Sequence, residues 1–371
     1  MKRGPSLNQG RLLRYVLQGV ALGAVATALV LVFTTGEDTW IHLKEFSPAY
    51  LPLLFAMVVT AWACNGGRVW LMCRAMGHPL RYRQAISVSL STEFGIAATP
   101  AGVGGTVIRL TLLRQAGLPY VTSGSLLATD AAVDVVFFSL LAPFAIYLIL
   151  HDGILRALVR EPSEAHAFLG LGLVAAAVAG VILLLRSDRF HRGVARCLAA
   201  TKFGRRRRLP ARHRHLRTAV RRSVRRIGGS LAFLWRERKS ALLLNLGLAS
   251  IQWCCRYMIL PVILLSLNTP VNPLPLFLVQ GFLFALSLMV VAPGGGGSVE
   301  LLTALILPGF VNPGLIGVVV VVWRFFTYHL YLLGGGTVFF YTCHRLHRIF
   351  PASRTERLEE FSSAEEQPGA P

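Results

Sequence analysis

Apolar residues in this chain gather in long continuous runs rather than in the alternating patterns of soluble helices and strands. A helix needs roughly 20 apolar residues, at about 1.5 Å per residue, to cross the hydrocarbon core of a bilayer. The pattern therefore predicts an all-α polytopic membrane protein. The six predicted full spans are about Leu12–Phe33, Ala49–Trp70, Val121–Leu150, Ala167–Leu185, Ala241–Leu267 and Leu315–Tyr341.

Two further apolar segments are interrupted by proline and glycine. They are Gln84–Arg114, interrupted at Pro100–Gly105, and Leu274–Leu307, interrupted at Pro293–Ser298. Proline and glycine end helices, and irregular backbone at membrane depth survives only inside protein or along a cavity. We interpret both segments as re-entrant helical hairpins. Surface loops between ordinary spans are the alternative, which the shared proline-first break and the short first half of the earlier segment disfavour.

Basic and acidic residues alternate between the loops and predict the orientation. The N-terminus and the stretches 73–118, 186–239 and 344–357 are basic, whereas 36–47 and 151–166 carry the acidic residues. Because cytoplasmic loops retain Lys and Arg, we expect both termini in the cytoplasm, in the inner membrane of a bacterium. The first hairpin would then enter from the cytoplasm and the second from outside. The span–hairpin–span units 49–150 and 241–341 would thus form an inverted repeat, a pattern typical of transporters with a midplane site.

Composition agrees with a membrane protein and identifies one basic segment. Of 371 residues 54% are hydrophobic and 15% charged, and the mean hydropathy is +0.57. Soluble domains carry about 25% charged residues. The net charge is +21, but 19 of the 38 basic residues lie in Arg186–Lys239, beside predicted spans. We therefore expect no nucleic acid as partner, and anionic lipid headgroups near this segment.

Eight charged residues in the predicted spans and hairpins are candidates for a site, because charge there is expensive and usually functional. They are Arg68, Glu93, Arg109, Asp130, Asp134, Arg256, Glu300 and Arg324. Arg68 is near a span end, and we expect it to snorkel to the cytoplasmic interface. Asp130 and Asp134 are four apart and share a helix face. Their expected partner is Arg109, Arg256 or Arg324, in a pair that either holds helices together or serves transport.

The glycine-rich breaks suggest an anion site, because free backbone N–H groups at a helix start bind anions. Arginine would add the charge that a lipid phosphate needs. Mirrored positions of Glu93 before the first break and Glu300 after the second fit an inverted repeat. The predicted substrate-binding residues are Glu93, Pro100, Gly102, Gly104, Gly105, Arg109, Asp130, Asp134, Arg256, Pro293, Gly294, Gly295, Gly296, Gly297, Glu300 and Arg324.

Motifs of common enzymes are missing from the sequence. The glycines ending at Gly105 are followed by Thr106-Val107 rather than by the lysine of a phosphate-binding NTPase loop, and there is no HExxH or GxSxG. The cysteines show no paired CxxC spacing, so neither a zinc site nor a disulfide framework is predicted. We expect no catalytic residue, metal or cofactor. Two alternatives stay open: a prenyl or lipid-modifying transferase that binds magnesium through Asp130 and Asp134, and a scaffold of a lipid-synthesis complex that docks through Arg186–Lys239.

The motifs resemble those of a known family. Glu93-Phe-Gly-Ile-Ala-Ala-Thr-Pro-Ala-Gly-Val-Gly-Gly105, with Arg109, Arg114-Gln-Ala-Gly117 and Asp134, is similar to the transmembrane domain of lysylphosphatidylglycerol synthases. Pro293-Gly-Gly-Gly-Gly-Ser-Val-Glu300 followed by Arg324 resembles that family's second motif. The resemblance covers roughly Leu12–Tyr341 and implies a flippase, a protein that moves a lipid between leaflets.

The resemblance also sets expectations about domains and partners. The synthases carry a large soluble aminoacyltransferase domain, whereas about thirty residues follow the last span here, so aminoacyl transfer is not expected. Thr106 stands where an acidic residue is expected after the glycines. We expect one transmembrane domain over 1–345 and a partly disordered cytoplasmic tail over 346–371. Membrane lipids are the expected partners, with a lipid-biosynthesis enzyme as a further one.

Overall fold

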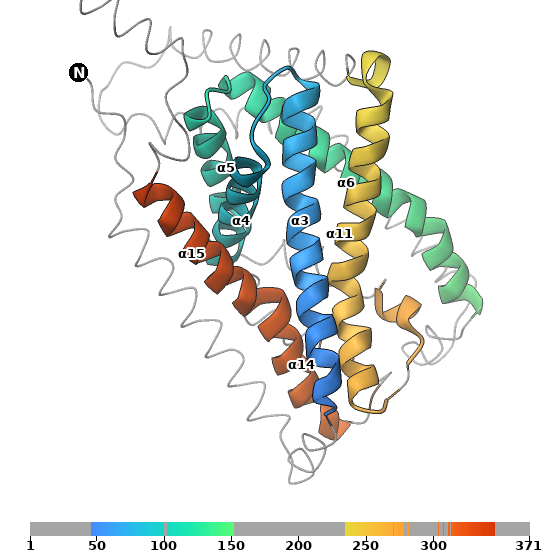
Figure 1. Cartoon of the computed structure of the whole chain (residues 1–371). Coiled ribbons are helices and arrows are strands. Elements are labelled where there is room, and N and C mark those ends of the chain that lie inside the picture. Colours follow the sequence, from blue (N-terminus) through green and yellow to red (C-terminus); the bar gives the residue numbers. More distant parts are fainter. Residues whose placement is uncertain are drawn as a thin grey trace, which may run out of the picture. The chain divides into compact units, whose positions relative to one another are not determined.

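The computed structural model describes residues 46–99, 102–151, 234–269, 271–277, 280–281, 303, 307, 311 and 313–345. Every regular element within these residues is a helix (Figure 1). Within this described part of the chain, four helical stretches are long and apolar enough to cross a membrane: Pro48–Ala75, Tyr120–Leu141, Lys239–Ser266 and Ile316–His344. They match four of the six predicted spans. The predicted spans Leu12–Phe33 and Ala167–Leu185 lie outside the described residues.

The helices follow the predicted boundaries closely. The main ones are α3 (Leu51–Ala75), α4 (Tyr82–Ala98), α5 (Val103–Gln115), α6 (Tyr120–His151), α11 (Lys239–Ser266), α14 (Ile316–Arg324) and α15 (Leu330–His344). Short 3₁₀ turns at Pro48–Tyr50 and Pro313–Leu315 precede α3 and α14. A π-helical turn, Phe325–His329, joins α14 to α15. Such turns are frequent at functional sites.

Contacts divide the chain into two compact units. The first comprises Met1–Phe137 and Ser240–Pro371, and the second comprises Phe138–Lys239. The described part of the second unit is the end of α6 and residues 234–239. All of the side chains discussed below belong to the first unit.

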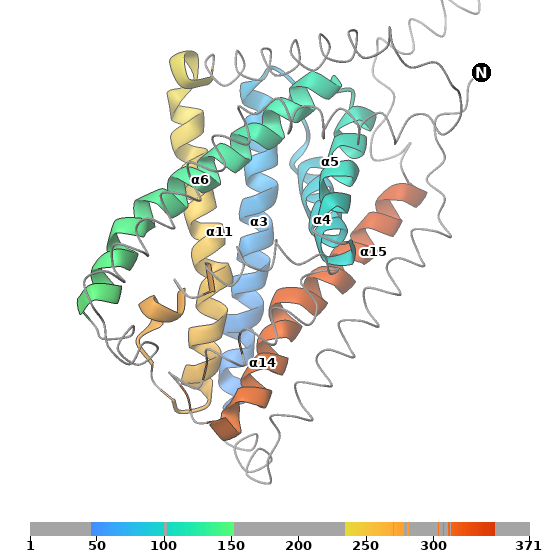
Figure 2. The same ribbon diagram turned by 180° about the vertical axis from the view of Figure 1, so that it is seen from behind.

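Helices α3 and α11 lie side by side in antiparallel orientation (Figures 1 and 2). Leu54 and Val58, near the start of α3, share one apolar cluster with Ile263, near the end of α11, and with Val319 of α14. At the same end of the pair, the Ser47 N–H donates to the Ser266 carbonyl at 2.9 Å. The opposite halves of α3 and α11 are therefore brought together as well, and these halves carry polar residues.

The first proline–glycine break separates two short antiparallel helices, α4 and α5, as the sequence predicts. Helix α4 ends at Ala98 and α5 begins at Val103, with Gly102 in the left-handed region at φ +67°. The two helices have 17 and 13 residues. At about 1.5 Å per residue neither reaches the roughly 30 Å of a hydrocarbon core. Re-entry from one membrane face stays a prediction, and the second predicted hairpin, Leu274–Leu307, lies mostly outside the described residues.

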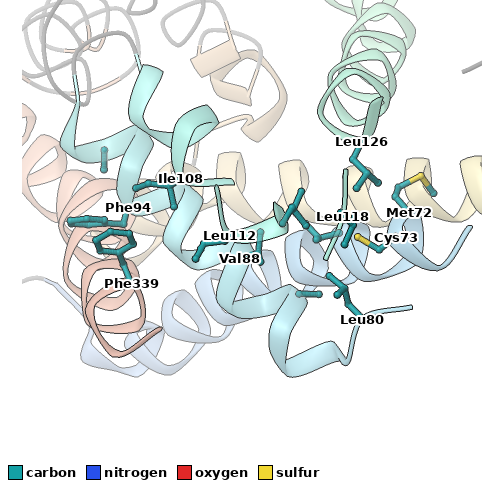
Figure 3. Packing of buried hydrophobic residues seen from close by; sticks show 14 of the residues in the cluster. Met72, Cys73, Leu80, Val88, Phe94, Ile108, Leu112, Leu118, Leu126 and Phe339 are labelled. Atoms are coloured by element: carbon teal, nitrogen blue, oxygen red, sulfur yellow. The ribbon is translucent and has the colours of Figure 1, made fainter. Parts of the chain in front are cut away.

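Glycines let α4 approach α5 and α15 closely. A methyl group added at Gly95 would lie 2.8 Å from backbone atoms of Gly104 and Gly105 in α5. One added at Gly335 in α15 would lie 2.7 Å from the Leu90 carbonyl oxygen. Figure 3 shows Phe94 of α4 facing Phe339 of α15, with the rings stacked at 5.2 Å between centroids. Helix α4 thus packs closely against both α5 and α15.

Replacing Gly95 by alanine is expected to destabilise the protein. The added methyl group meets backbone, which cannot rotate away, so the α4–α5 pair must separate, at a cost of about 1–3 kcal/mol. The measurement is the thermal unfolding midpoint in detergent. Gly247→Ala in α11 is the matched control, because its added methyl group meets nothing within 4 Å. Alanine is the better helix former by about 1 kcal/mol, so the control should be neutral or more stable. Equal midpoints would contradict the close approach.

Candidate functional site

Arg68 occupies the centre of a buried polar network among α3, α6 and α11. Its Nε donates to Asn245 Oδ1 at 2.9 Å, and its Nη1 donates to Gln252 Oε1 at 3.0 Å. Its Nη2 donates to the Asp130 carbonyl oxygen at 3.1 Å and lies 2.8 Å from Asp134 Oδ1. Every nitrogen of the guanidinium has a partner. This matches the rule that a buried charge is paired and hydrogen-bonded.

Asp130 is the carboxylate that joins α6 to both α5 and α11. It forms an ion pair with Arg109 Nη2 of α5, and its Oδ1 accepts a hydrogen bond from Asn245 Nδ2 at 3.2 Å. Arg109 Nε is buried and finds no hydrogen-bond partner among the described residues. Arg109 thus holds one carboxylate and keeps a second donor that an additional oxygen atom can use.

Asp134 lies one helical turn further along α6 and is the most exposed carboxylate of the network. Its Oδ1 receives the Trp253 Nε1–H at 3.0 Å in addition to the contact with Arg68. Its side chain is 28% exposed, against 9% for Asp130. The two aspartates share a helix face, as predicted from their spacing, but they have different surroundings.

Glu93 and Arg256 form a second ion pair beside the first network. Asn65 Nδ2 donates to Glu93 Oε1 at 2.8 Å, and Arg256 Nη1 lies 3.4 Å from Glu93 Oε2. The Arg256 guanidinium also lies over two aromatic rings, 4.7 Å from the centroid of Tyr331 and 5.7 Å from that of Trp253. Trp253 therefore touches both networks, one through its N–H and the other through its ring.

Six charged side chains make up what we call the charge cluster: Arg68, Glu93, Arg109, Asp130, Asp134 and Arg256. Three are positive and three are negative, so these six sum to zero. Arg256 lies ten residues before the end of α11, and Asp134 lies fourteen after the start of α6. These separations correspond to about 15 Å and about 21 Å along the helices. The cluster thus lies well inside the candidate spans.

Five of the predicted site residues come together in this cluster: Glu93, Arg109, Asp130, Asp134 and Arg256. Of the three arginines expected as partners of the aspartates, Arg109 forms the ion pair with Asp130. Arg324, in the last span, has its guanidinium 4.6 Å from the centroid of Tyr328 and its carbonyl oxygen 3.2 Å from His329 Nδ1. The remaining predicted residues outside the described part of the chain are Pro100, Pro293, Gly294, Gly295, Gly296, Gly297 and Glu300.

The expected role of free backbone N–H groups in the first break is wrong for its three described glycines. The N–H of Gly102 donates to the Thr99 carbonyl at 3.2 Å, and that of Gly105 donates to the Gly102 carbonyl at 3.1 Å. The N–H of Gly104 donates to Thr99 Oγ1 at 2.8 Å. These groups already satisfy one another within the turn. The glycines serve close packing of α4 against α5 instead.

The expectation that Arg68 snorkels to the interface is also wrong. Its side chain is 3% exposed and connects α3 to α6 and α11. It does so because two amides and two aspartates contact it inside the bundle. Sequence reasoning also missed Asn65, Asn245, Gln252 and Trp253. A signal was present in α11: Asn245, Gln252 and Arg256 recur at intervals of seven and four, which places them on one face of an otherwise apolar helix.

The arrangement is suited to exchange of ionic partners. Its charged groups are paired carboxylates and guanidiniums, and within the described residues no group of three or more His, Cys, Asp and Glu side chains could hold a metal ion. Arginine binds carboxylate and phosphate with the same donor geometry. A phosphate that reaches the cluster can therefore replace a carboxylate on Arg109 or Arg256.

Comparisons with known proteins agree with a membrane protein of one family. The family model for the lysylphosphatidylglycerol synthase TM region matches residues 16–335. A UPF0104 membrane protein of Archaeoglobus fulgidus is 23% identical over 323 residues, which are 85% of this chain and 94% of that protein. The similarity therefore includes all of the helices that carry the charge cluster.

Proposed function

The chain belongs to the lysylphosphatidylglycerol synthase transmembrane-region family, and from this premise we propose that it moves a phosphate-bearing lipid between the leaflets of the membrane. The acyl or prenyl chains of such a lipid can stay in the hydrocarbon, so only the headgroup needs a polar path. The observation that carries the proposal is the charge cluster, which offers charged groups to a headgroup well inside the candidate spans.

Exchange of partners explains how a headgroup would enter such a site. Breaking a buried ion pair and leaving one charge alone costs about 3–5 kcal/mol. A phosphate that binds Arg109 while Asn245 still donates to Asp130 replaces part of the lost interaction. The spare Arg109 Nε donor adds a bond to the phosphate that the resting pair does not make. The barrier to entry is therefore smaller than that of breaking the pair alone.

The surroundings of the two aspartates argue against the transferase alternative. Magnesium takes carboxylate oxygens and water in octahedral geometry. Asp130 is bound by Arg109 and Asn245, and Asp134 is bound by Arg68 and Trp253. A magnesium ion between them would have to displace cationic donors and would sit beside two guanidiniums. Transport, which needs no metal, fits this environment better.

Reconstituted vesicles test the proposal directly. Vesicles with a phospholipid labelled on an acyl chain in both leaflets receive dithionite, which quenches only the label on the outside. We expect dithionite to quench the inner-leaflet label faster when the protein is present than in protein-free vesicles, and at the same rate with EDTA. Leu244→Ala is the control for reconstitution, because Leu244 is 60% exposed on α11. Rates equal to protein-free vesicles would contradict transport. Magnesium-dependent turnover of a polyprenyl substrate would favour the transferase.

A further inference from the structure

The two most exposed members of the charge cluster have opposite charge and contact the same indole ring. The Asp134 side chain is 28% exposed and that of Arg256 is 16% exposed, whereas that of Arg68 is 3% exposed. Trp253 donates its Nε1–H to Asp134 and carries Arg256 over its ring. Trp253 and Arg256 are three residues apart on α11 and therefore share a face. A carboxylate and a guanidinium thus both contact Trp253 where the cluster is most open.

Aromatic rings surround the guanidinium at the same place. The Trp253 and Tyr257 ring centroids are 5.4 Å apart, and the Tyr331 ring lies against Arg256. The faces of Trp253 and Tyr331 hold Arg256, so the attraction for an amine comes from the Asp134 carboxylate. The opening therefore offers a cation site at Asp134 and an anion site at Arg256.

Charge balance limits what this opening can accept. The six side chains of the cluster sum to zero, so a headgroup with a net charge brings an uncompensated charge into a region of low dielectric. A headgroup that carries one phosphate and one amine brings none. It can exchange partners in pairs, with the amine on Asp134 and the phosphate on Arg256. The net charge of the cluster with its bound headgroup then stays zero.

We propose that Asp134, Trp253 and Arg256 form a two-part receptor that selects zwitterionic phospholipid headgroups, with a phosphate and an amine, over headgroups of net charge. The proposal rests on the proposed translocation function and adds its substrate class. Asp134 holds the amine, Arg256 holds the phosphate, and Trp253 sets the distance between them.

The wild-type protein tests this selectivity without any variant. In the dithionite assay, vesicles carry labelled phosphatidylethanolamine, labelled phosphatidylglycerol or a labelled cationic ethyl-phosphocholine lipid. The label of each lipid is attached to an acyl chain, so that its headgroup is unchanged. We expect the protein to move the zwitterionic lipid at least about tenfold faster than either charged lipid, because an uncompensated buried charge is costly in a region of low dielectric. Equal acceleration of all three lipids would overturn the receptor but leave transport standing. No acceleration of any lipid would overturn transport itself.

Two variants should shift the preference in opposite directions. Asp134→Asn keeps an oxygen acceptor for Trp253 and Arg68 but leaves the cluster with one excess positive charge. The rate of phosphatidylglycerol movement should therefore rise relative to that of phosphatidylethanolamine. Arg256→Gln leaves one excess negative charge, so the rate of movement of the cationic lipid should rise instead. Leu244→Ala should keep the wild-type order. Thermal midpoints confirm that each variant is folded. Shifts in the same direction for both variants, or no shift in folded protein, would refute the receptor.

Discussion

Replacing Arg68 by methionine is expected to lower the free energy of unfolding by about 3–5 kcal/mol, the range for removing one member of a buried ion pair. Methionine fills a similar volume, so packing is not the main loss. The loss is electrostatic: Asp130 and Asp134 keep one fewer cation, and the acceptors on Asn245 and Gln252 lose their donor. The measurement is the thermal unfolding midpoint of the detergent-solubilised protein.

Arg74→Met is the matched control for this prediction. Arg74 is on the same helix, in its last turn, but it is exposed and lies over the ring of Trp70 at 5.6 Å. Exposed contacts of this kind contribute only about 0.5–1 kcal/mol. Arg68→Lys should fall between the two, because lysine restores the charge but not the forked geometry that reaches several acceptors. If Arg68→Met and Arg74→Met have the same thermal unfolding midpoint, the network around Arg68 does not stabilise the packing of the helices.

The spans and the first helical break follow from the sequence because each depends on local composition. Apolar runs predicted α3, α6, α11 and the α14–α15 span to within a few residues at either end. The break between α4 and α5 follows from Pro100–Gly105, because glycine at 102 adopts a positive φ and the N–H groups bond within the turn. Helix type and helix ends are local properties, and one sequence suffices for them.

The pairing of charges depends on helix rotation and could not be read from one sequence. Arg68 looked like an interfacial residue because it is near the end of an apolar run, yet α3 continues to Ala75 and packs that turn against α6 and α11. Which arginine meets which carboxylate depends on helix crossings that no local pattern contains. The sequence thus identifies the intramembrane carboxylates and arginines as a set. It does not identify which arginine pairs with which carboxylate.

Glycine has two physical uses that look alike in a sequence. The glycines of the first break suggested free N–H groups for an anion, but Gly104 and Gly105 instead allow backbone contact with Gly95. Gly335, in the middle of an apolar helix, serves the same purpose against α4. Separating close packing from ligand binding requires the position of the neighbouring helix, which only the folded structure provides.

Joint replacement of Arg109 by glutamine and Asp130 by asparagine is expected to separate the structural role of the pair from its role in transport. Either single change leaves a buried charge with one partner fewer and should lower stability by about 3–5 kcal/mol. The double variant removes both charges and keeps groups that can hydrogen-bond to each other and to Asn245. Its stability should therefore recover most of the loss, because replacing both partners is often nearly neutral.

Transport should not recover with stability. A phosphate binds glutamine far more weakly than it binds a guanidinium, because charge-assisted hydrogen bonds are about twice as strong as neutral ones. We expect lipid movement in the double variant to fall at least about tenfold, which corresponds to about 1.4 kcal/mol of lost interaction. The net charge of the cluster is unchanged in this variant, so a general electrostatic effect does not explain such a fall.

The rate at which the folded double variant moves labelled phosphatidylethanolamine between leaflets, relative to wild type in matched vesicles, tests most directly whether a headgroup uses the charge cluster. Thermal midpoints are measured on the same preparations, so that only folded protein is compared. A stable double variant with a rate close to that of protein-free vesicles is the predicted result. A stable double variant that moves lipid as fast as wild type would mean that Arg109 and Asp130 only hold the helices together and that no headgroup phosphate binds Arg109.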